Sequence, residues 1–326
     1  MGPHPAVAAV RLAVRRALAD LDPGARVLVA CSGGADSLAL LAATAFEARR
    51  PAHTVVGLTV DHGLQDGSAE RAARVVEQMR ALGAEARAVR VAVGTTGGPE
   101  AAARAARYGA LDAAAEDHDA DVVLLGHTRD DQAETVLLGL ARGSGARSLS
   151  GMAPRSGRYR RPLLDLTRED TRAACAADQL TPWEDPHNED PSFARVRVRR
   201  QVMPVLEREL GPGVAESLAR TARLLRDDAD ALDELAEAVR ATTQDAAGAL
   251  DARALAREAP AIRRRVLRRT ALEAGCPGTE LFAVHVDAMD SLVADWHGQT
   301  GVDLPGGLRM RRQGGSLLIV ENPVAG

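Results

Sequence analysis

The segment Val27-Leu-Val-Ala-Cys-Ser-Gly-Gly-Ala-Asp-Ser37 predicts a buried strand, a tight glycine turn and the beginning of a helix. Its first four residues form an apolar run typical of a strand, and the apolar residues after Ser37 continue as a helix. Gly33 and Gly34 let backbone N–H groups lie close together, because no Cβ intervenes. Such a loop at a helix N-terminus binds anions, since its unpaired N–H groups and the helix dipole face the ligand.

Asp36 lies in the first turn after this loop, where a carboxylate can hold Mg²⁺ on bound phosphates. A first-turn carboxylate can also serve the helix alone, so local chemistry leaves both functions open. The spacing Ser-Gly-Gly-x-Asp-Ser resembles the pyrophosphate loop of the N-type ATP pyrophosphatases, which cleave ATP between its α and β phosphates. The resemblance implies that ATP is bound by Ser32, Gly33, Gly34, Ala35, Asp36 and Ser37, with Asp36 as the metal ligand.

Length and composition limit the remaining possibilities. A chain of 326 residues is longer than one compact domain usually is, so we expect two domains. The net charge of −4 gives no overall positive field, so any RNA contact must come from local arginine clusters. The apolar runs are too short to span a membrane and no signal-peptide core is present, so we expect a cytoplasmic protein with no membrane partner.

Cysteine and lysine usage excludes several classes of site. The three cysteines, Cys31, Cys175 and Cys276, form no Cys-x-x-Cys pair, which argues against a disulfide scaffold, a local iron–sulfur motif and a zinc ribbon. Cys31 fits strand packing better than a nucleophile. The sequence contains no lysine, which excludes a Walker-type loop and a covalent lysyl–nucleotide mechanism. Bound phosphates must therefore be held by backbone N–H groups, metal and arginine.

Strand and helix patterns alternate along the first half of the chain. Strand patterns occupy residues 27–30, 53–60, 85–93 and 121–126, and helix patterns precede, separate and follow them. This alternation predicts an α/β domain with a doubly wound parallel sheet. Asp61 and His62 end the second strand, where polar residues face the ligand crevice of such a sheet. They are candidates for nucleotide binding, although a polar turn that closes the strand explains them equally well.

The fourth strand is followed directly by His127-Thr-Arg-Asp-Asp-Gln-Ala-Glu-Thr135. Asp130 and Asp131 stand at the start of a helix, and Glu134 lies one turn further along. First-turn acids can simply favour the helix dipole. A histidine and three acids at the mouth of a parallel sheet would nevertheless repel one another without a cation, so we expect a bound metal or amine.

Together these motifs resemble the tRNA(Ile)-lysidine synthetase family over roughly residues 25–210. The matching segments, in chain order, are Ser32–Ser37, Asp61-His-Gly-Leu64, Glu100…Arg104…Arg107-Tyr108, His127–Thr135, Arg142-Gly-Ser-Gly145, Arg161-Pro-Leu-Leu164 and Glu184-Asp-Pro-His-Asn188, then Asp190, Phe193, Arg195 and Arg199. Two positions depart from the family pattern: Val196, where asparagine is common, and His187, which replaces a serine.

The resemblance implies an ATP-dependent ligase that joins free L-lysine to carbon 2 of the wobble cytosine in the tRNA(Ile) with a CAU anticodon. ATP first adenylates the cytosine 2-oxygen and releases pyrophosphate. The ε-amine of lysine then attacks carbon 2 and AMP leaves, so that the modified tRNA reads AUA. The loop N–H groups and Mg²⁺ on Asp36 would stabilise charge on the departing pyrophosphate.

The resemblance also suggests roles for individual residues. Asp131 is the first candidate for the second catalytic carboxylate, acting on metal or on the lysine ammonium, with support from Asp130 and Glu134. A nearby carboxylate would also accept the proton that the ammonium must lose before it attacks. His127 would neutralise or orient phosphate, and Arg107 would contact the activated base or phosphate.

Arginines in the second half suggest contacts with tRNA. Positive charge is concentrated, with no acid in between, at the start of a helix that runs to Leu210: Arg195, Arg197, Arg199 and Arg200. A solvated face is the plain alternative, but the implied tRNA partner favours phosphate contacts. A second basic patch lies at Arg263-Arg-Arg-Val-Leu-Arg-Arg269.

The domain organisation follows from breaks in the pattern. Residues 1–210 would form the ATP pyrophosphatase domain, residues 211–248 a helical linker with a long helix at 214–243, and residues 249–326 a small α/β tRNA-binding domain. We expect helices at 251–274 and 280–295, then strands at 300–312 and 316–320. Leu304-Pro-Gly-Gly307 resembles the family's first C-terminal domain. The sequence leaves open whether the protein forms a homodimer.

Three other functions compete. A 2-thiocytidine-type sulfur transferase would need paired cysteines for cluster or persulfide chemistry, and this chain lacks such a pair. An amidating synthetase of the NAD or GMP type would lack the Asp-Asp-x-x-Glu group and the arginine-rich second half. A nucleotide-binding module without activity would show no tRNA-dependent pyrophosphate release, and the acid cluster argues against it.

Overall fold

The computed structural model describes residues 2–63, 67–92, 94, 98–143, 145–185 and 189–322, with only the backbone at residues 99 and 100. The motif residues Leu64, Ser144, Pro186, His187 and Asn188 lie outside this described part. The chain folds into two compact units, Met1–Arg226 and Asp227–Gly326, and each unit has its own apolar core.

The first unit contains a six-stranded sheet in the order β3-β2-β1-β4-β6-β5. Its strands are β1 (Arg26–Ala30), β2 (Thr54–Asp61), β3 (Glu85–Arg90), β4 (Val122–Leu124), β5 (Arg155–Ser156) and β6 (Tyr159–Arg160). All neighbouring pairs are parallel except the β5–β6 hairpin, which the sequence did not predict. The chain builds β2 and β3 on one side of β1 and β4 on the other, so the strand order reverses between β1 and β4. The predicted doubly wound parallel sheet is confirmed, with β3 and β4 shorter than expected.

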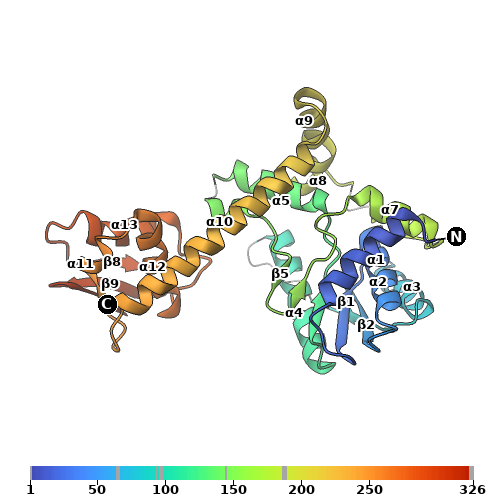
Figure 1. Ribbon diagram of the computed structural model, residues 1–326, viewed down its shortest axis with the longest axis horizontal. Coiled ribbons are helices and arrows are strands. Elements are labelled where there is room, and N and C mark those ends of the chain that lie inside the picture. Colours follow the sequence, from blue (N-terminus) through green and yellow to red (C-terminus); the bar gives the residue numbers. More distant parts are fainter. Residues whose placement is uncertain are drawn as a thin grey trace. The chain divides into compact units, whose positions relative to one another are not determined.

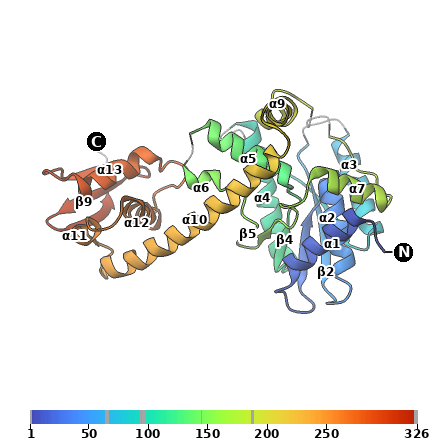
Figure 2. The same ribbon diagram turned by 45° about the horizontal axis from the view of Figure 1, so that its top comes forward.

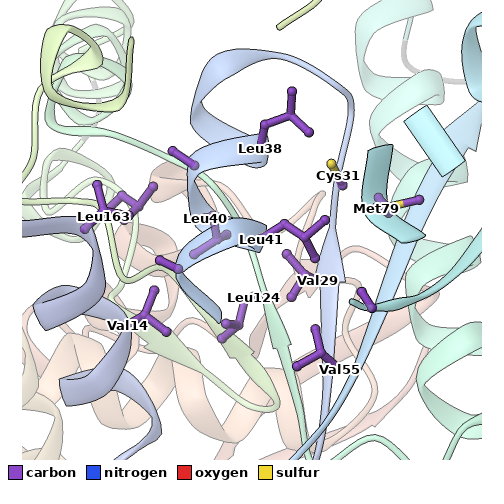
Figure 3. Packing of buried hydrophobic residues seen from close by; sticks show 14 of the residues in the cluster. Val14, Val29, Cys31, Leu38, Leu40, Leu41, Val55, Met79, Leu124 and Leu163 are labelled. Atoms are coloured by element: carbon purple, nitrogen blue, oxygen red, sulfur yellow. The ribbon is translucent and has the colours of Figure 1, made fainter. Parts of the chain in front are cut away.

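Helices cover both faces of this sheet. One core packs α1 (Pro5–Leu18), α2 (Ala35–Glu47), α3 (Ser68–Ala81) and α7 (Arg168–Ala177) against Val27 and Val29 of β1. The other packs α4 (Pro99–Asp117) against Leu28, which points to the opposite face because side chains alternate along a strand. Figure 1 shows α1 and α2 beside β1 and β2, and Figure 3 shows Val14, Leu40 and Leu41 gathered around Val29 and Leu124.

The segment that carries the first arginine cluster is not one regular helix. It consists of α8 (Ala194–Arg197), a π-helical turn (Val198–Val202) and α9 (Met203–Leu210). Pro204 provides the physical reason, because it has no N–H to donate to the carbonyl of Arg200 and its ring would clash there. The wider π-helical turn keeps the Pro204 ring away from that carbonyl. In this turn the Met203 N–H donates to the Val198 carbonyl, five residues earlier.

The chain continues into the second unit through α10 (Val214–Thr243), whose bounds are those predicted. The second unit has an antiparallel sheet in the order β7-β10-β9-β8. Its elements are β7 (Leu250–Asp251), α11 (Ala252–Leu255), α12 (Pro260–Glu273), α13 (Ala283–Ala294), β8 (Gly301–Leu304), β9 (Leu308–Gln313) and β10 (Ser316–Glu321). Figure 2 shows α12 and α13 with this small sheet.

Two expectations for this unit were too simple. The region 251–274 forms two helices, because Pro260 opens α12 at the first-turn position that proline favours. The region 300–312 forms two strands that turn at Gly306 and Gly307, both with positive φ.

The second basic patch is also not a free positive surface. Arg263 is buried and forms a two-bond pair with Asp290, whose second oxygen also accepts from Arg264. Arg265 pairs with Asp233, and Arg269 pairs with Glu273. Acids of α10, α12 and α13 therefore pair with four arginines of this patch, and Arg268 donates to the Leu281 carbonyl at 2.6 Å. In the described part of the chain, no helix combines the length and apolarity needed to cross a bilayer.

Candidate active site

The site lies where the strand order reverses, at the carboxyl ends of β1 and β4. The glycine loop follows β1, and Gly126 and His127 follow β4. A Cβ on Gly126 would lie 3.1 Å from the backbone of Asp36 and Ser37, so only glycine lets these two segments approach so closely. The fold thus brings the phosphate loop and the acidic motif into direct contact.

Internal hydrogen bonds shape the glycine loop. The Ser37 hydroxyl donates to the Gly34 carbonyl over 3.0 Å and accepts from the Ser32 N–H over 3.1 Å. Gly33 has φ of 85°, and its carbonyl accepts a hydrogen bond of 2.9 Å from the backbone N–H of Trp183. Gly34 is the N-cap of α2, so no side chain covers the first N–H groups of that helix from the cap position. This is the geometry expected of an anion site.

A pocket of about 130 Å³ opens beside the loop. Its lining includes Ser32, Asp61 and His62, three of the residues predicted to bind ATP, together with Arg71 of α3 and Trp183. The Arg71 guanidinium lies 4.9 Å from the centre of the Trp183 ring. Burial and the positive charge of Arg107 lower the pKa of His62, so this imidazole is neutral at pH 7. The pocket combines polar edges with an aromatic wall, as a nucleotide site requires.

The acids of α5 (Arg129–Ala141) are paired with arginines from three other elements, α7, α8 and the π-helical turn. Asp131 Oδ1 accepts from Arg168 at 2.8 Å and from Arg199 at 3.4 Å. Glu134 is buried and accepts from Arg199 at 2.7 Å and from Arg168 at 3.3 Å. Arg195 Nε lies 3.7 Å from Glu134. Burial alone would raise the pKa of Asp131, but Arg168 and a Thr128 N–H outweigh it and hold that pKa below its ordinary value.

These pairs bear on two expectations. The repulsion expected among the acids is offset by guanidinium groups of the chain itself. Arg195 and Arg199, which are predicted to contact tRNA, have side chains that point into the acid cluster. Arg197 donates to the carbonyls of Pro191 and Ser192, and Arg200 pairs with Glu189, although both are exposed. The sequence could not show these partners, because they lie 60 or more positions away for Arg195 and Arg199.

Asp130 and Asp131 have different functions in the structure. Asp130 Oδ2 accepts from the backbone N–H of Arg168 at 2.8 Å, so it contacts the N-terminus of α7. Asp131 Oδ2 accepts from the backbone N–H of Thr128 at 2.9 Å, while Oδ1 faces the arginines. Asp131 is therefore the member of this pair that faces the cluster.

Asp36 lies between the loop and the acid cluster. Its Oδ1 accepts from the buried Thr171 hydroxyl, and its Oδ2 lies 3.9 Å from Arg168 Nε. Burial raises the pKa of Asp36 to about 6, so it is mainly ionised at neutral pH.

The surroundings of Asp36 fit Mg²⁺ held mainly by substrate phosphates. Among the described residues, no group of three or more His, Cys, Asp or Glu side chains could hold a metal by itself. Magnesium in nucleotide sites commonly uses one or two carboxylates and completes its shell with phosphate oxygens and water. Asp36, with its loosely paired Oδ2 next to the phosphate loop, matches that requirement.

His127 is neutral in the chain by itself, and its role in neutralising or orienting phosphate stays a prediction. Burial and the positive charges of Arg107, Arg161 and Arg195 hold its pKa well below the ordinary value. Its Nδ1 is buried and makes no hydrogen bond to the described residues, so it can still orient a bound group. Burial also lowers the pKa of Arg107, the half-buried arginine of α4. Arg104 is exposed.

Several residues of the site were missed in the sequence. Arg168, Thr171, Trp183 and Arg71 carry no motif that marks them as functional. The capping box Thr167-x-x-Asp170 does predict the start of α7, which places Arg168 at its first position. The direction in which Arg168 points was decided by the packing of α7 near α2.

The cysteines fit structural positions. Cys31 and Cys175 are buried beside the phosphate loop, and Cys175 Sγ contacts the Ala35 carbonyl at 3.3 Å. Burial raises the pKa of both thiols, that of Cys175 to about 12, so neither forms a thiolate readily. Cys276 belongs to the second unit.

Comparisons with known proteins identify the family of this chain. A model of the PP-loop domain matches residues 9–206, and a model described as the TilS substrate binding domain matches residues 250–318. The tRNA(Ile)-lysidine synthase of Thermobifida fusca is 59% identical over 98% of this chain and 98% of its own length. The tRNA(Ile)-lysidine synthase of Streptomyces coelicolor is 56% identical over 98% of this chain and 99% of its own.

A solved structure shares the fold. The U34-tRNA thiolase NcsA from Methanococcus maripaludis, determined with its [4Fe-4S] cluster, aligns with a TM-score of 0.57 over 68% of this chain and 80% of its own. At 19% identity this likeness concerns the fold alone. The near full-length matches above 50% identity go further: the chain belongs to the tRNA(Ile)-lysidine synthase family of ATP-using ligases.

Proposed function

We propose that this protein ligates free L-lysine to carbon 2 of the wobble cytidine of the CAU-anticodon tRNA(Ile), in the cytoplasm, with cleavage of ATP to AMP and pyrophosphate. One observation supports this most strongly. The phosphate loop and an acid pair able to hold an ammonium lie side by side, with Arg168 in contact with Asp36 on one side and Asp131 on the other. An activated base and an incoming amine can therefore meet in one site.

The first step would form the adenylated tRNA. The cytosine 2-oxygen attacks the α-phosphorus of ATP, a new O–P bond forms, and the bond to pyrophosphate breaks. The N–H groups at the start of α2 would bind the departing pyrophosphate, because they and the helix dipole favour negative charge. Mg²⁺ on Asp36, when bound, would supply additional charge stabilisation. The nucleoside would occupy the pocket lined by Asp61, His62 and Trp183.

The second step would transfer lysine. The lysine ε-nitrogen attacks carbon 2, the C–O bond to the phosphate breaks, and AMP leaves. Asp131 and Glu134 would hold the ammonium through the oxygens that face Arg168 and Arg199. The ammonium must lose a proton before it attacks, and a carboxylate of this pair would accept it. Arg107 and the neutral His127 would orient the base or the α-phosphate.

We propose the predicted division into a catalytic domain at 1–210, a linker at 211–248 and a tRNA-binding domain at 249–326. The match to a substrate binding domain at residues 250–318 supports the last of these. The exposed Arg197 and Arg200 are the members of the first arginine cluster with side chains open to tRNA phosphates.

The test is incorporation of radiolabelled lysine into transcribed tRNA with a CAU anticodon, with and without ATP. We expect ATP-dependent labelling of the isoleucine tRNA, whereas the methionine tRNAs with the same anticodon serve as the matched control and stay unlabelled. Pyrophosphate release without any lysine incorporation would instead indicate a different nucleophile, such as the sulfur of a thiolase reaction.

A further inference from the structure

The first turn of α7 contacts the acids of two other helices. The Arg168 guanidinium donates to Asp131 at 2.8 Å and to Glu134 at 3.3 Å, both on α5, and its Nε lies 3.9 Å from Asp36 on α2. The Arg168 backbone N–H donates to Asp130 at 2.8 Å. One turn later, the buried Thr171 hydroxyl donates to the other oxygen of Asp36. A single helical turn therefore holds all four acids of the site.

This arrangement differs from that of the other two arginines. Arg199 and Arg195 form ion pairs with acids of α5, and they come from the irregular segment around the π-helical turn. Arg168 forms ion pairs with acids of both α5 and α2, and its side chain begins at the capped N-terminus of a regular helix. A guanidinium has several fixed donors in one plane, so it can fix the relative positions of carboxylates that would otherwise repel one another.

The helix that carries Arg168 is itself well anchored. Thr167 and Asp170 form a capping box, and the carbonyl of Leu166 accepts from the Arg129 N–H at the start of α5 at 2.8 Å. Cys175 links α7 to the loop through the Ala35 carbonyl. The contacts of Leu166 and Cys175 thus tie α7 to α5 and to the start of α2, the two elements whose acids Arg168 joins.

We propose that Arg168 is a positioning residue for lysine transfer: it fixes the acid pair that accepts the lysine ammonium relative to Asp36 and the phosphate loop. This inference rests on the proposed function. Since its hydrogen bonds go to Asp131 and Glu134 whereas Asp36 lies at 3.9 Å, its loss should affect lysine much more than ATP.

The test compares the wild type with Arg168→Ala and Arg168→Gln in two assays. One measures tRNA-dependent pyrophosphate release without lysine, and the other measures lysine incorporation as a function of lysine concentration. In Arg168→Ala we expect the KM for lysine to rise about tenfold or more, with the KM for ATP within about threefold of the wild type. Arg168→Gln keeps one amide donor, so its KM for lysine should lie between the two.

Thr167→Ala is the matched control, because it removes the cap of the same helix and leaves the guanidinium in place. It should lower Tm but leave the KM for lysine within about twofold. Equal losses in both assays for Arg168→Ala, or the same KM shift in Thr167→Ala, would overturn the positioning role. If Arg168→Ala does not fold, Arg168→Gln decides the same comparison. Failure of the proposed function itself would appear separately, as absence of lysine incorporation by the wild type.

Discussion

Both units of this protein contain a cluster of arginines and acids, but the two clusters differ in their balance and surroundings. In the second unit, Arg263 and Asp290 are both buried and meet through two hydrogen bonds of 2.6 and 3.2 Å between α12 and α13. In the first unit, Asp131 and Glu134 share Arg168 and Arg199 beside the phosphate loop, and His127 and Arg195 each keep a buried nitrogen without a hydrogen bond to the described residues.

We infer from this difference that the same kinds of side chain serve packing in the second unit and, as proposed above, lysine transfer in the first. The buried Arg263–Asp290 pair satisfies most of its own donors and acceptors, so few remain for a ligand. A shared set of charges at the carboxyl end of a parallel sheet can exchange partners when an ammonium or phosphate enters. The location in the fold therefore separates the two roles, while the composition of the clusters does not.

The strongest test of this contrast is Asp131→Asn. We expect lysine incorporation to fall by about a thousandfold, because the amide cannot hold the ammonium or accept its proton. Single-turnover labelling of the isoleucine tRNA measures the loss. Asp130→Asn is the matched neighbour and should lose far less activity, since Asp130 contacts the backbone of α7. Equal losses in the two variants would contradict the separate functions given to these residues.

The corresponding change in the second unit is Asp290→Ala, which should act on stability. It leaves Arg263 buried without its charge partner, at a cost of about 3 kcal/mol in the free energy of unfolding. Denaturant unfolding, followed by a probe in the second unit, measures this. Asp287→Ala removes only the exposed 3.5 Å pair with Arg264 and should cost less than about 1 kcal/mol. A similar small cost for Asp290→Ala would show that its pair is no more important than a surface one.

A smaller effect is expected from Pro204→Ala, which tests how the first cluster is built. An N–H at position 204 would let the helix continue without the π-helical turn, and this would turn Arg199 away from Glu134. Loss of one charge-assisted hydrogen bond should raise the KM for lysine about fivefold. Pro260→Ala, at the first turn of α12, is the control and should leave this KM unchanged. An unchanged KM in Pro204→Ala would show that the turn does not position Arg199.

The smallest effect concerns the charge of His127 as pH changes. Its pKa is lowered in the folded protein, so the unfolded chain binds a proton first as pH falls below about 6.5. Stability contributed by the neutral imidazole is therefore present above that pH and is lost as pH falls toward the folded pKa. In NMR spectra of histidine-labelled protein, the His127 signal is the one that disappears in His127→Asn. At pH 5.5 that signal should still have the chemical shift of a neutral imidazole. A normal titration near pH 6.5 would contradict the burial argument.

Local patterns in the sequence predicted the elements that fix the site's location. The apolar run and glycines of 27–37 gave β1, the loop and the start of α2, and the acids after 121–126 were correctly placed at the start of α5. The predicted helix bounds were wrong where a single proline interrupts the helical pattern, as at Pro204 and Pro260. Periodicity reports which face of an element is buried, and it cannot report which charged side chain of another element lies there.

The sequence by itself determined the fold class, the phosphate loop and the residue types available for chemistry, because these depend on neighbouring residues and short spacings. The tertiary structure alone decided which charges are paired. Arg168 meets Asp131 and Glu134 across more than 30 positions, and Arg199 meets Glu134 across 65. Such pairs form only when the sheet and its helices bring distant segments together, so the arginines that looked free in the sequence became parts of the site.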